Sequence, residues 1–213
     1  MLKDLMPSLA EILTISYDDI KTSETDNIIQ QSLQGITSKE NPILLQISGI
    51  PGAGKSTYCK THLMPDFLYI SFDNIMLELS EYKNEIISNS IESAYKKYEM
   101  PARAIGYELL NQALKLKLNI MLEHSGTNKA HLELFKNIKN KGYQTAVNFI
   151  VCDVNVALRR SKDREIEQKR HVPEKIILER AKFFNAFIEE YSKITSNVKI
   201  YDGSNNFNLL KKI

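Results

Sequence analysis

The 213-residue chain lacks several features that mark whole classes of protein. It has two cysteines, Cys59 and Cys152, which are far apart and form no CxxC pair. We therefore expect buried free thiols rather than disulfides, and a cytoplasmic protein. The four histidines do not show zinc-ligand spacing, so no zinc site is expected. No apolar run approaches the roughly 20 residues that span a bilayer, and the first ten residues do not resemble a secretory signal.

An excess of charge of one sign is also missing. Lysine and arginine number 28 against 26 aspartate and glutamate, a formal net charge of +2. This balance lacks the basic surplus typical of nucleic-acid-binding proteins, so a nucleic-acid partner is not favoured. With 43% hydrophobic residues, the chain can build an ordinary globular core. The length predicts one domain, or one domain with a small appendage.

The pattern of the chain changes near residue 41. Residues 1–40 are polar and poor in glycine, with helical stretches expected at 7–12 and 25–33, so we predict an N-terminal helical arm. Residues 41–213 alternate apolar strands with amphipathic helices, which predicts an α/β domain with a mainly parallel five-stranded sheet and helices on both faces. Strands are expected at 43–47, 67–71, 119–123, 145–151 and 198–201.

Three helical segments of this domain have predicted boundaries. A long helical region over 81–98 is expected to be interrupted near Pro101. A helix over 154–161 is expected to give way to a charged stretch that reaches His171. In parallel sheets of this kind, ligands bind at the carboxyl ends of the strands, where the motifs described next are predicted to lie.

A phosphate-binding loop follows the first strand. Residues 49–56 read GIPGAGKS and fit the pattern G-x-x-x-x-G-K-[ST], between an apolar strand and a helix. The glycines let backbone N–H groups converge on phosphate oxygens, and the helix that begins near Lys55 adds its positive dipole end. Lys55 can reach the β- and γ-phosphates, and the Ser56 hydroxyl is a ligand for Mg²⁺. The residues expected to bind the nucleotide are Gly49, Pro51, Gly52, Ala53, Gly54, Lys55, Ser56 and Thr57.

Two other classes of nucleotide-binding protein fit the sequence poorly. A GTPase needs an N/T-K-x-D motif to read guanine, and residues 128–131 read NKAH, without the aspartate. A motor ATPase needs a strand that ends in paired acidic residues, whereas the strand at 119–123 ends in Glu123-His124. These differences favour a kinase.

Asp73 is the candidate for the side of the site that holds the phosphate acceptor. It stands two residues past the strand at 67–71, across the cleft from the phosphate loop, where a carboxylate can take the proton of an attacking hydroxyl. The same position suits a helix N-cap, and spacing alone does not separate the two interpretations.

The loop after the third predicted strand reads EHSGTN and gathers a carboxylate, hydroxyls and an amide. Glu123, Thr127 and Asn128 are the candidate substrate contacts, and Glu123 can also hold Mg²⁺ through water. Thr127 or Asn128 can instead cap the next helix, and the two roles can coexist.

An arginine-rich segment covers residues 159–170, with six basic residues against three acidic ones. Guanidinium groups stabilise the charge that spreads over a transferring phosphoryl group. We interpret residues 159–172 as a mobile lid that closes over ATP. A solvated helix face and an RNA-binding patch are the alternatives; the first would place Arg160 beside Arg164 as like charges, and the second would call for more aromatic residues.

Taken in order, these motifs resemble the zeta toxin family of P-loop kinases, within the polynucleotide-kinase-like group. The resemblance rests on residues 49–56, 73–76, 100–110, 123–128 and 170–173, and covers about residues 41–201. It implies ATP- and Mg²⁺-dependent phosphorylation of a hydroxyl, which in zeta toxins belongs to UDP-N-acetylglucosamine. It also implies an antitoxin as a protein partner.

The resemblance assigns roles to individual residues. Lys55 and Ser56 would hold ATP and magnesium, and Asp73 would be the base for the acceptor hydroxyl. Glu123 and Thr127 would contact the substrate. The lid arginines would be Arg170 with Arg160 or Arg164.

Other functions stay open on sequence alone. Within enzymes, the alternative is a polynucleotide 5′-hydroxyl kinase or another metabolite kinase. In a different class, the chain would be a non-catalytic ATP-binding regulatory module with residues 1–40 as a docking arm.

Overall fold

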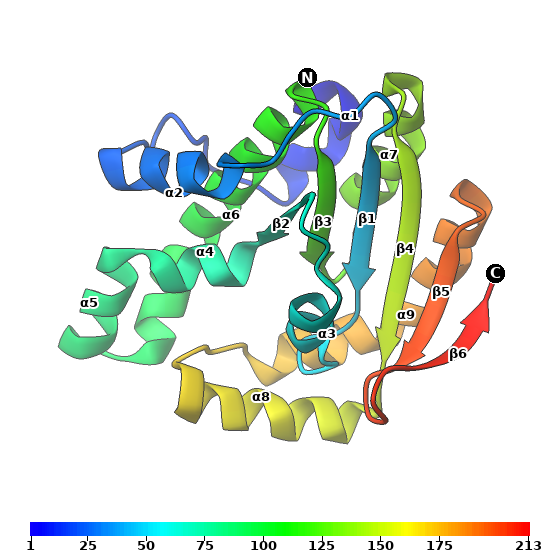
Figure 1. Cartoon of the computed structure of the whole chain (residues 1–213). Coiled ribbons are helices and arrows are strands. Elements are labelled where there is room, and N and C mark those ends of the chain that lie inside the picture. The colour runs from blue at the N-terminus through cyan, green and yellow to red at the C-terminus, as the bar shows by residue number, and fades with distance from the viewer.

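The computed structural model describes all 213 residues as one sheet flanked by helices (Figure 1). The sheet has six strands in the order β2-β3-β1-β4-β5-β6, of which β1 to β5 are parallel and β6 runs antiparallel to β5. This confirms the predicted α/β fold with a mainly parallel sheet. The strands are β1 (Ile43–Ser48), β2 (Phe67–Ser71), β3 (Asn119–His124), β4 (Gln144–Val151), β5 (Val198–Asp202) and β6 (Asn208–Lys212).

The prediction of five strands was one short, because it did not include β6. This edge strand is exposed along its whole length and reads NLLKK, without the alternation of apolar and polar residues that identifies a half-buried strand. It pairs antiparallel with β5, and a turn at residues 203–207 joins the two strands. This pairing holds β6 in place. Sequence periodicity carries no signal for such a strand.

The helices lie on both faces of the sheet, with α3 in front and α7 and α9 behind it in Figure 1. Serine or asparagine side chains cap several of their N-termini, as at Ser90 before α6 and Asn128 before α7. The helical elements are α1 (Leu2–Leu5), η1 (Pro7–Glu11), α2 (Ser23–Leu33), α3 (Lys55–His62), α4 (Phe72–Glu78), α5 (Ser80–Ser88), α6 (Ile91–Lys115), α7 (Lys129–Ile138), η2 (Lys139–Lys141), α8 (Val154–Gln168) and α9 (Glu174–Ile194).

Two predicted helix boundaries were wrong. The region over 81–98 is divided at Asn89, and α6 then runs through Pro101 without interruption. A proline inside a helix costs about 3 kcal/mol, which the burial of the following apolar face offsets; Ile105 and Leu109 of that face are fully buried. Helix α8 continues through the charged stretch to Gln168 and ends at Lys169, which has a left-handed backbone.

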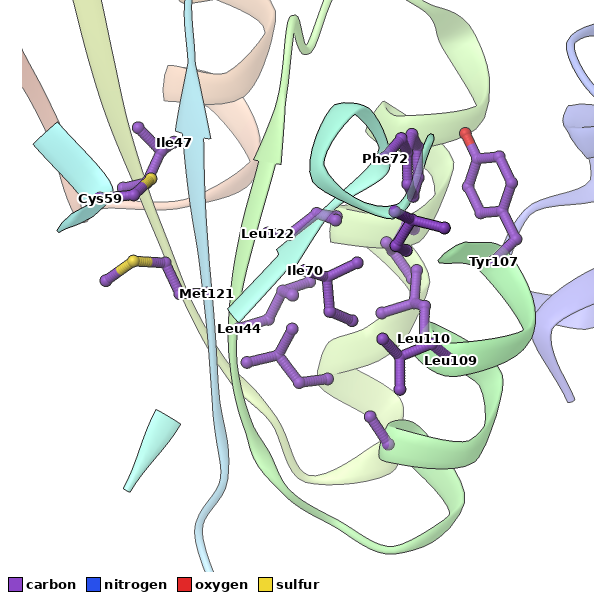
Figure 2. Close-up of a cluster of buried hydrophobic side chains, with 14 of the residues drawn as sticks. Leu44, Ile47, Cys59, Ile70, Phe72, Tyr107, Leu109, Leu110, Met121 and Leu122 are labelled. Carbon is purple, nitrogen blue, oxygen red and sulfur yellow. The ribbon is translucent and has the colours of Figure 1, made fainter. Parts of the chain in front are cut away.

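Alternation along the strands divides the core between the two faces of the sheet (Figure 2). Ile47 of β1 lies with Cys59 of α3 on one side. Ile70 of β2 lies with Leu109 and Leu110 of α6 on the other side. The strands are therefore buried on both faces, which explains why they read as apolar runs in the sequence.

The N-terminal segment packs into the same core. Leu2, Met6 and Ile29 are buried in one cluster with the residues of the sheet. The Leu2 amide donates a hydrogen bond to Asn111 of α6, and the Ser8 amide donates to Glu133 of α7. In Figure 1, α1 lies toward the edge of the sheet where the parallel strands begin, opposite the phosphate loop. None of the helices combines the length and apolarity that a membrane crossing needs.

Candidate active site

The phosphate loop joins β1 to α3 and is packed tightly against its neighbours. Gly52 and Gly54 have φ values of 87° and 104°, a left-handed backbone that other residues rarely adopt. A side chain at Gly52 would also overlap the backbone of Ala157 in α8. Both glycines are therefore required by the shape of the loop, which aims its amide groups toward the N-terminus of α3.

Lys55 stands at the first position of α3 and is almost fully buried. Its Nζ donates hydrogen bonds to the carbonyl oxygens of Gly49 at 2.9 Å and Ile50 at 3.2 Å. Burial lowers the pKa of Lys55 to about 7, and the nearby Glu123 carboxylate opposes that shift. An anion bound in the loop would stabilise the charged ammonium.

The buried Glu123 and the partly buried Ser56 and Tyr69 form a polar group on the α3 side of the sheet. The Ser56 hydroxyl donates to Glu123 Oε1 at 2.7 Å, and the Tyr69 hydroxyl donates to the other carboxylate oxygen. Burial and the Glu123 charge raise the pKa of Tyr69, so the phenol keeps its proton and remains a donor. The hydroxyl and carboxylate oxygens of Ser56 and Glu123 are the hard ligands that Mg²⁺ prefers, so these residues fit a magnesium ion.

Asp73 lies in the first turn of α4 and faces Arg170. The N-cap of α4 is Ser71, whose hydroxyl accepts a hydrogen bond from the Asn74 amide. Asp73 is therefore not the helix cap. Its carboxylate, with a side-chain exposure of 35%, forms an ion pair with the buried Arg170 guanidinium.

Arg170 links the two sides of the site. Its Nη1 approaches the Ser56 hydroxyl at 3.4 Å, while its Nη2 pairs with Asp73. Its Nε is the one fully buried polar side-chain atom of the chain that has no hydrogen-bond partner. Burial lowers the pKa of Arg170 to about 10, so the group remains charged at neutral pH.

A cavity, which we call the acceptor cavity, opens beside Asp73. Its walls come from the phosphate loop, α4, α6, the end of β3, the segment between α8 and α9, and α9, so six separate parts of the chain build it. Four cations and three carboxylates meet there, and Arg103 pairs with Glu99. The lining residues are Pro51, Lys55, Phe72, Asp73, Met76, Tyr95, Glu99, Ala102, Arg103, Glu123, His124, Ser125, Arg170, Val172 and Arg180.

A second cavity of 470 Å³, which we call the nucleotide cavity, lies on the other side of the phosphate loop. Its walls are Gly52 and Gly54 of the loop, Thr57 of α3, residues of α8, and the turn between β5 and β6. Arg160 of α8 donates to the Gly203 carbonyl at 2.8 Å and so ties the helix to that turn. Arg164 also lines this cavity, whereas the neighbouring Arg159 is exposed.

The structure separates the three candidate substrate contacts. Glu123 lines the acceptor cavity, but Thr127 and Asn128 are not among its lining residues. Asn128 accepts a hydrogen bond from the His131 amide at 2.9 Å and caps α7. Thr127 donates to the Ser125 hydroxyl at 3.1 Å, and Ser125 takes the place in the cavity wall that was expected for Thr127.

Several lining residues were not identified from the sequence. Arg180 reaches the acceptor cavity from α9, and Phe207 reaches the nucleotide cavity from the β5–β6 turn. Phe207 packs edge-on against Tyr58, with ring centroids 5.3 Å apart. Neither residue belongs to a motif; Phe207 follows the last predicted strand, whereas Arg180 lies within a helix and has no local signal.

Comparisons with known proteins agree with this geometry. The family model for zeta toxin matches residues 26–212. A search of curated proteins found no match. A solved structure from the PezAT chromosomal toxin–antitoxin system of Streptococcus pneumoniae is similar to the chain, with a TM-score of 0.68 and 18% identity. The similarity covers 92% of this chain and 83% of that one.

Two further solved structures share the fold. The AvrRxo1-ORF1:ORF2 complex aligns with a TM-score of 0.62 and 10% identity, over 87% of this chain and 64% of that one. The Pnkp1/Rnl/Hen1 RNA repair complex aligns with a TM-score of 0.53 and 13% identity, over 83% and 50% of the two chains.

The sheet order, the phosphate loop at the end of β1 and the arginines at the same edge define a nucleotide-dependent kinase of the P-loop class. Because the family model covers most of its length, the chain belongs to the zeta toxin family. The expected resemblance is thereby confirmed.

Proposed function

We propose that this protein transfers the γ-phosphoryl group of ATP to a hydroxyl of a small molecule, with a UDP-N-acetyl sugar as the acceptor. The observation that carries the proposal is the position of Asp73. This carboxylate stands at the wall of the acceptor cavity, which it shares with Lys55, Glu123 and Arg170. A base and the groups that bind phosphate therefore face one enclosed space.

On the donor side, the loop amides and Lys55 hold the phosphates of ATP, with Thr57 beside them. The adenine and ribose of ATP occupy the nucleotide cavity between α8 and the β5–β6 turn, next to Arg160 and Arg164. Ser56 and Glu123 would hold a magnesium ion, which would supply positive charge to offset that of the triphosphate.

On the acceptor side, Asp73 orients the hydroxyl and accepts its proton as the new P–O bond forms. Arg170 lies between Asp73 and Ser56, so its guanidinium can exchange the Asp73 carboxylate for the oxygens of the transferring phosphoryl group. The unpartnered Nε supplies a further donor for that exchange.

The lining of the acceptor cavity supports a small molecule as the acceptor. Phe72, Met76 and Tyr95 add apolar surface to walls that also carry charged groups. Membership in the zeta toxin family, and the similar fold of a protein from a toxin–antitoxin system, support an antitoxin as a protein partner.

The proposal is tested by incubating the protein with radiolabelled ATP and a panel of UDP-sugars, 5′-hydroxyl oligonucleotides and cell extract. Asp73→Asn keeps the size of the side chain and removes the base. We expect transfer to UDP-N-acetylglucosamine to fall by a factor of about 10² to 10⁴, while ATP binding changes little. Lys55→Met is the matched control that weakens ATP binding itself.

Each outcome of this experiment is informative. Undiminished transfer by Asp73→Asn would overturn the base assignment. Labelling of the oligonucleotides alone would replace the sugar nucleotide with a polynucleotide acceptor. ATP binding with no acceptor in the whole panel would indicate a regulatory module.

A further inference from the structure

Two stacked histidines lie beneath the acceptor cavity. His124 is the last residue of β3 and lines the cavity, and His131 is fully buried in α7. Their rings are nearly parallel, with centroids 3.7 Å apart and an interplanar angle of 13°. Phe72 contacts the His124 ring edge-on at 5.7 Å. The imidazole of His124 is therefore held between two rings at the cavity wall.

His131 is fixed by a chain of buried hydrogen bonds. Gln46 Nε2 donates to the Ser48 hydroxyl at 2.7 Å and to the Tyr191 hydroxyl at 2.9 Å, which leaves Gln46 Oε1 as an acceptor. His131 Nδ1 lies 3.0 Å from that oxygen and donates to it. His131 Nε2 then accepts from the Tyr107 hydroxyl at 3.0 Å.

The network keeps His131 neutral. Burial lowers its pKa to about 3, and burial raises the pKa of Tyr107, so the phenol remains the donor. Both nitrogens of the His131 ring are thus hydrogen-bonded, and the ring is a fixed stacking partner for His124.

The tautomer of His124 follows from a backbone contact. The Gly126 amide donates to His124 Nδ1 at 3.0 Å, so that nitrogen carries no proton. Gly126 has a φ of 72°, and a side chain there would lie 2.8 Å from Gln46 Nε2 and would overlap the Ser48 hydroxyl. The glycine therefore lets the loop bring its amide onto the imidazole.

The remaining nitrogen of His124 carries the proton and opens to the cavity. Because Nδ1 accepts the Gly126 amide, the proton of the neutral ring lies on Nε2. Nε2 has no hydrogen-bond partner in the protein, yet it is not among the fully buried unpartnered atoms. Nε2 is therefore partly exposed, and it faces the acceptor cavity that His124 lines.

We propose that His124 binds the phosphate acceptor through a fixed Nε2–H donor aimed at an uncharged oxygen, a hydroxyl or a carbonyl, next to the hydroxyl that Asp73 activates. The inference rests on the kinase function proposed above and adds a specificity residue to it. A neutral donor suits an uncharged oxygen, because the cavity offers Arg103 and Arg180 to any anionic group. In this proposal His124 binds the acceptor, and Asp73 remains the base.

The first test needs no acceptor. Long-range ¹⁵N–¹H spectra of histidine-labelled protein should show His124 as the Nε2–H tautomer. An Nδ1–H tautomer would overturn the proposal whatever the enzyme phosphorylates.

The second test uses UDP-N-acetylglucosamine as the probe. His124→Phe keeps the stacked ring and removes both nitrogens, and His124→Gln restores an N–H donor without the ring. For His124→Phe we expect KM for the sugar nucleotide to rise about tenfold or more, while KM for ATP changes little. His124→Gln should recover part of the loss, which a purely structural role would not do.

The outcomes separate the two proposals. If wild-type protein phosphorylates the probe and His124→Phe has an unchanged KM, the role of His124 is wrong and the kinase function stands. If wild-type protein does not phosphorylate the probe, the proposed acceptor fails, and the tautomer then decides whether the donor exists. Should His124→Phe fail to fold, His124→Gln and the spectra of the wild-type protein carry the test.

Discussion

The two cavities beside the phosphate loop are built in different ways. The nucleotide cavity is lined mainly by three stretches, namely the loop, α8 and the β5–β6 turn, and Phe207 is its one large apolar side chain. The acceptor cavity draws on six parts of the chain and includes Phe72, Met76 and Tyr95 among its walls. A site for a common cosubstrate can be made from compact motifs, whereas a site for a particular acceptor requires the whole fold.

The comparison extends to the charges. Arg160 in the nucleotide cavity donates to a backbone carbonyl, and it holds two elements together. Arg170 in the acceptor cavity is buried and pairs with the very carboxylate proposed as the base. Two arginines from one basic segment of the sequence therefore have different environments, and we expect them to differ in function.

The largest expected effect comes from Arg170→Ala. Loss of this guanidinium should reduce kcat by a factor of about 10³ to 10⁵, because the proposed mechanism uses it to stabilise charge on the transferring phosphoryl group. Arg160→Ala is the matched control, with KM for ATP raised about tenfold and kcat nearly unchanged. Steady-state kinetics with both substrates varied measures the two effects. Equal losses of kcat in both variants would show that the two arginines act together as a lid and do not have different functions.

A smaller effect is expected from the titration of Lys55. Its pKa is about 7, and bound triphosphate should raise that value, so ATP binding takes up a proton above neutral pH. The dissociation constant for ATP should then increase with pH above 7, by up to about tenfold per unit. Calorimetry at pH 8 in two buffers of different ionisation enthalpy should show uptake of about one proton.

Lys55→Met is the control for this titration, because it retains the titration of ATP itself. The difference between the two proteins isolates the lysine. A dissociation constant for the wild-type protein that does not change between pH 7 and 9 would mean that Lys55 is already fully charged before ATP binds.

The same contrast explains what could be predicted from the sequence. The phosphate loop is contiguous, so the path of its backbone and the position of Lys55 follow from the residues themselves. The parallel sheet follows from apolar runs that are buried on both faces. By contrast, β6 has no apolar pattern, and Pro101 lies inside a helix whose buried face outweighs the local preference.

The acceptor cavity was predicted only in part. Asp73 and Glu123 could be found because each directly follows or ends a strand, and parallel strands bring their carboxyl ends together. Arg180 and Tyr95 lie in the middle of long helices, where nothing local distinguishes a residue that lines a cavity from one that faces solvent. Their contribution depends on how α6 and α9 cross the sheet, which is a property of tertiary packing.

The smallest expected effect concerns Asn128, which the sequence offered as a substrate contact. The structure uses its side chain to cap α7. Asn128→Ala should therefore lower the free energy of unfolding by about 1 kcal/mol, a decrease in Tm of about 2 to 4 °C for a chain of this size. KM for the acceptor should not change, whereas His124→Phe should raise it, although the two residues lie in one loop. A selective rise in KM for Asn128→Ala would move the boundary of the acceptor cavity outward along that loop and restore Asn128 as a substrate contact.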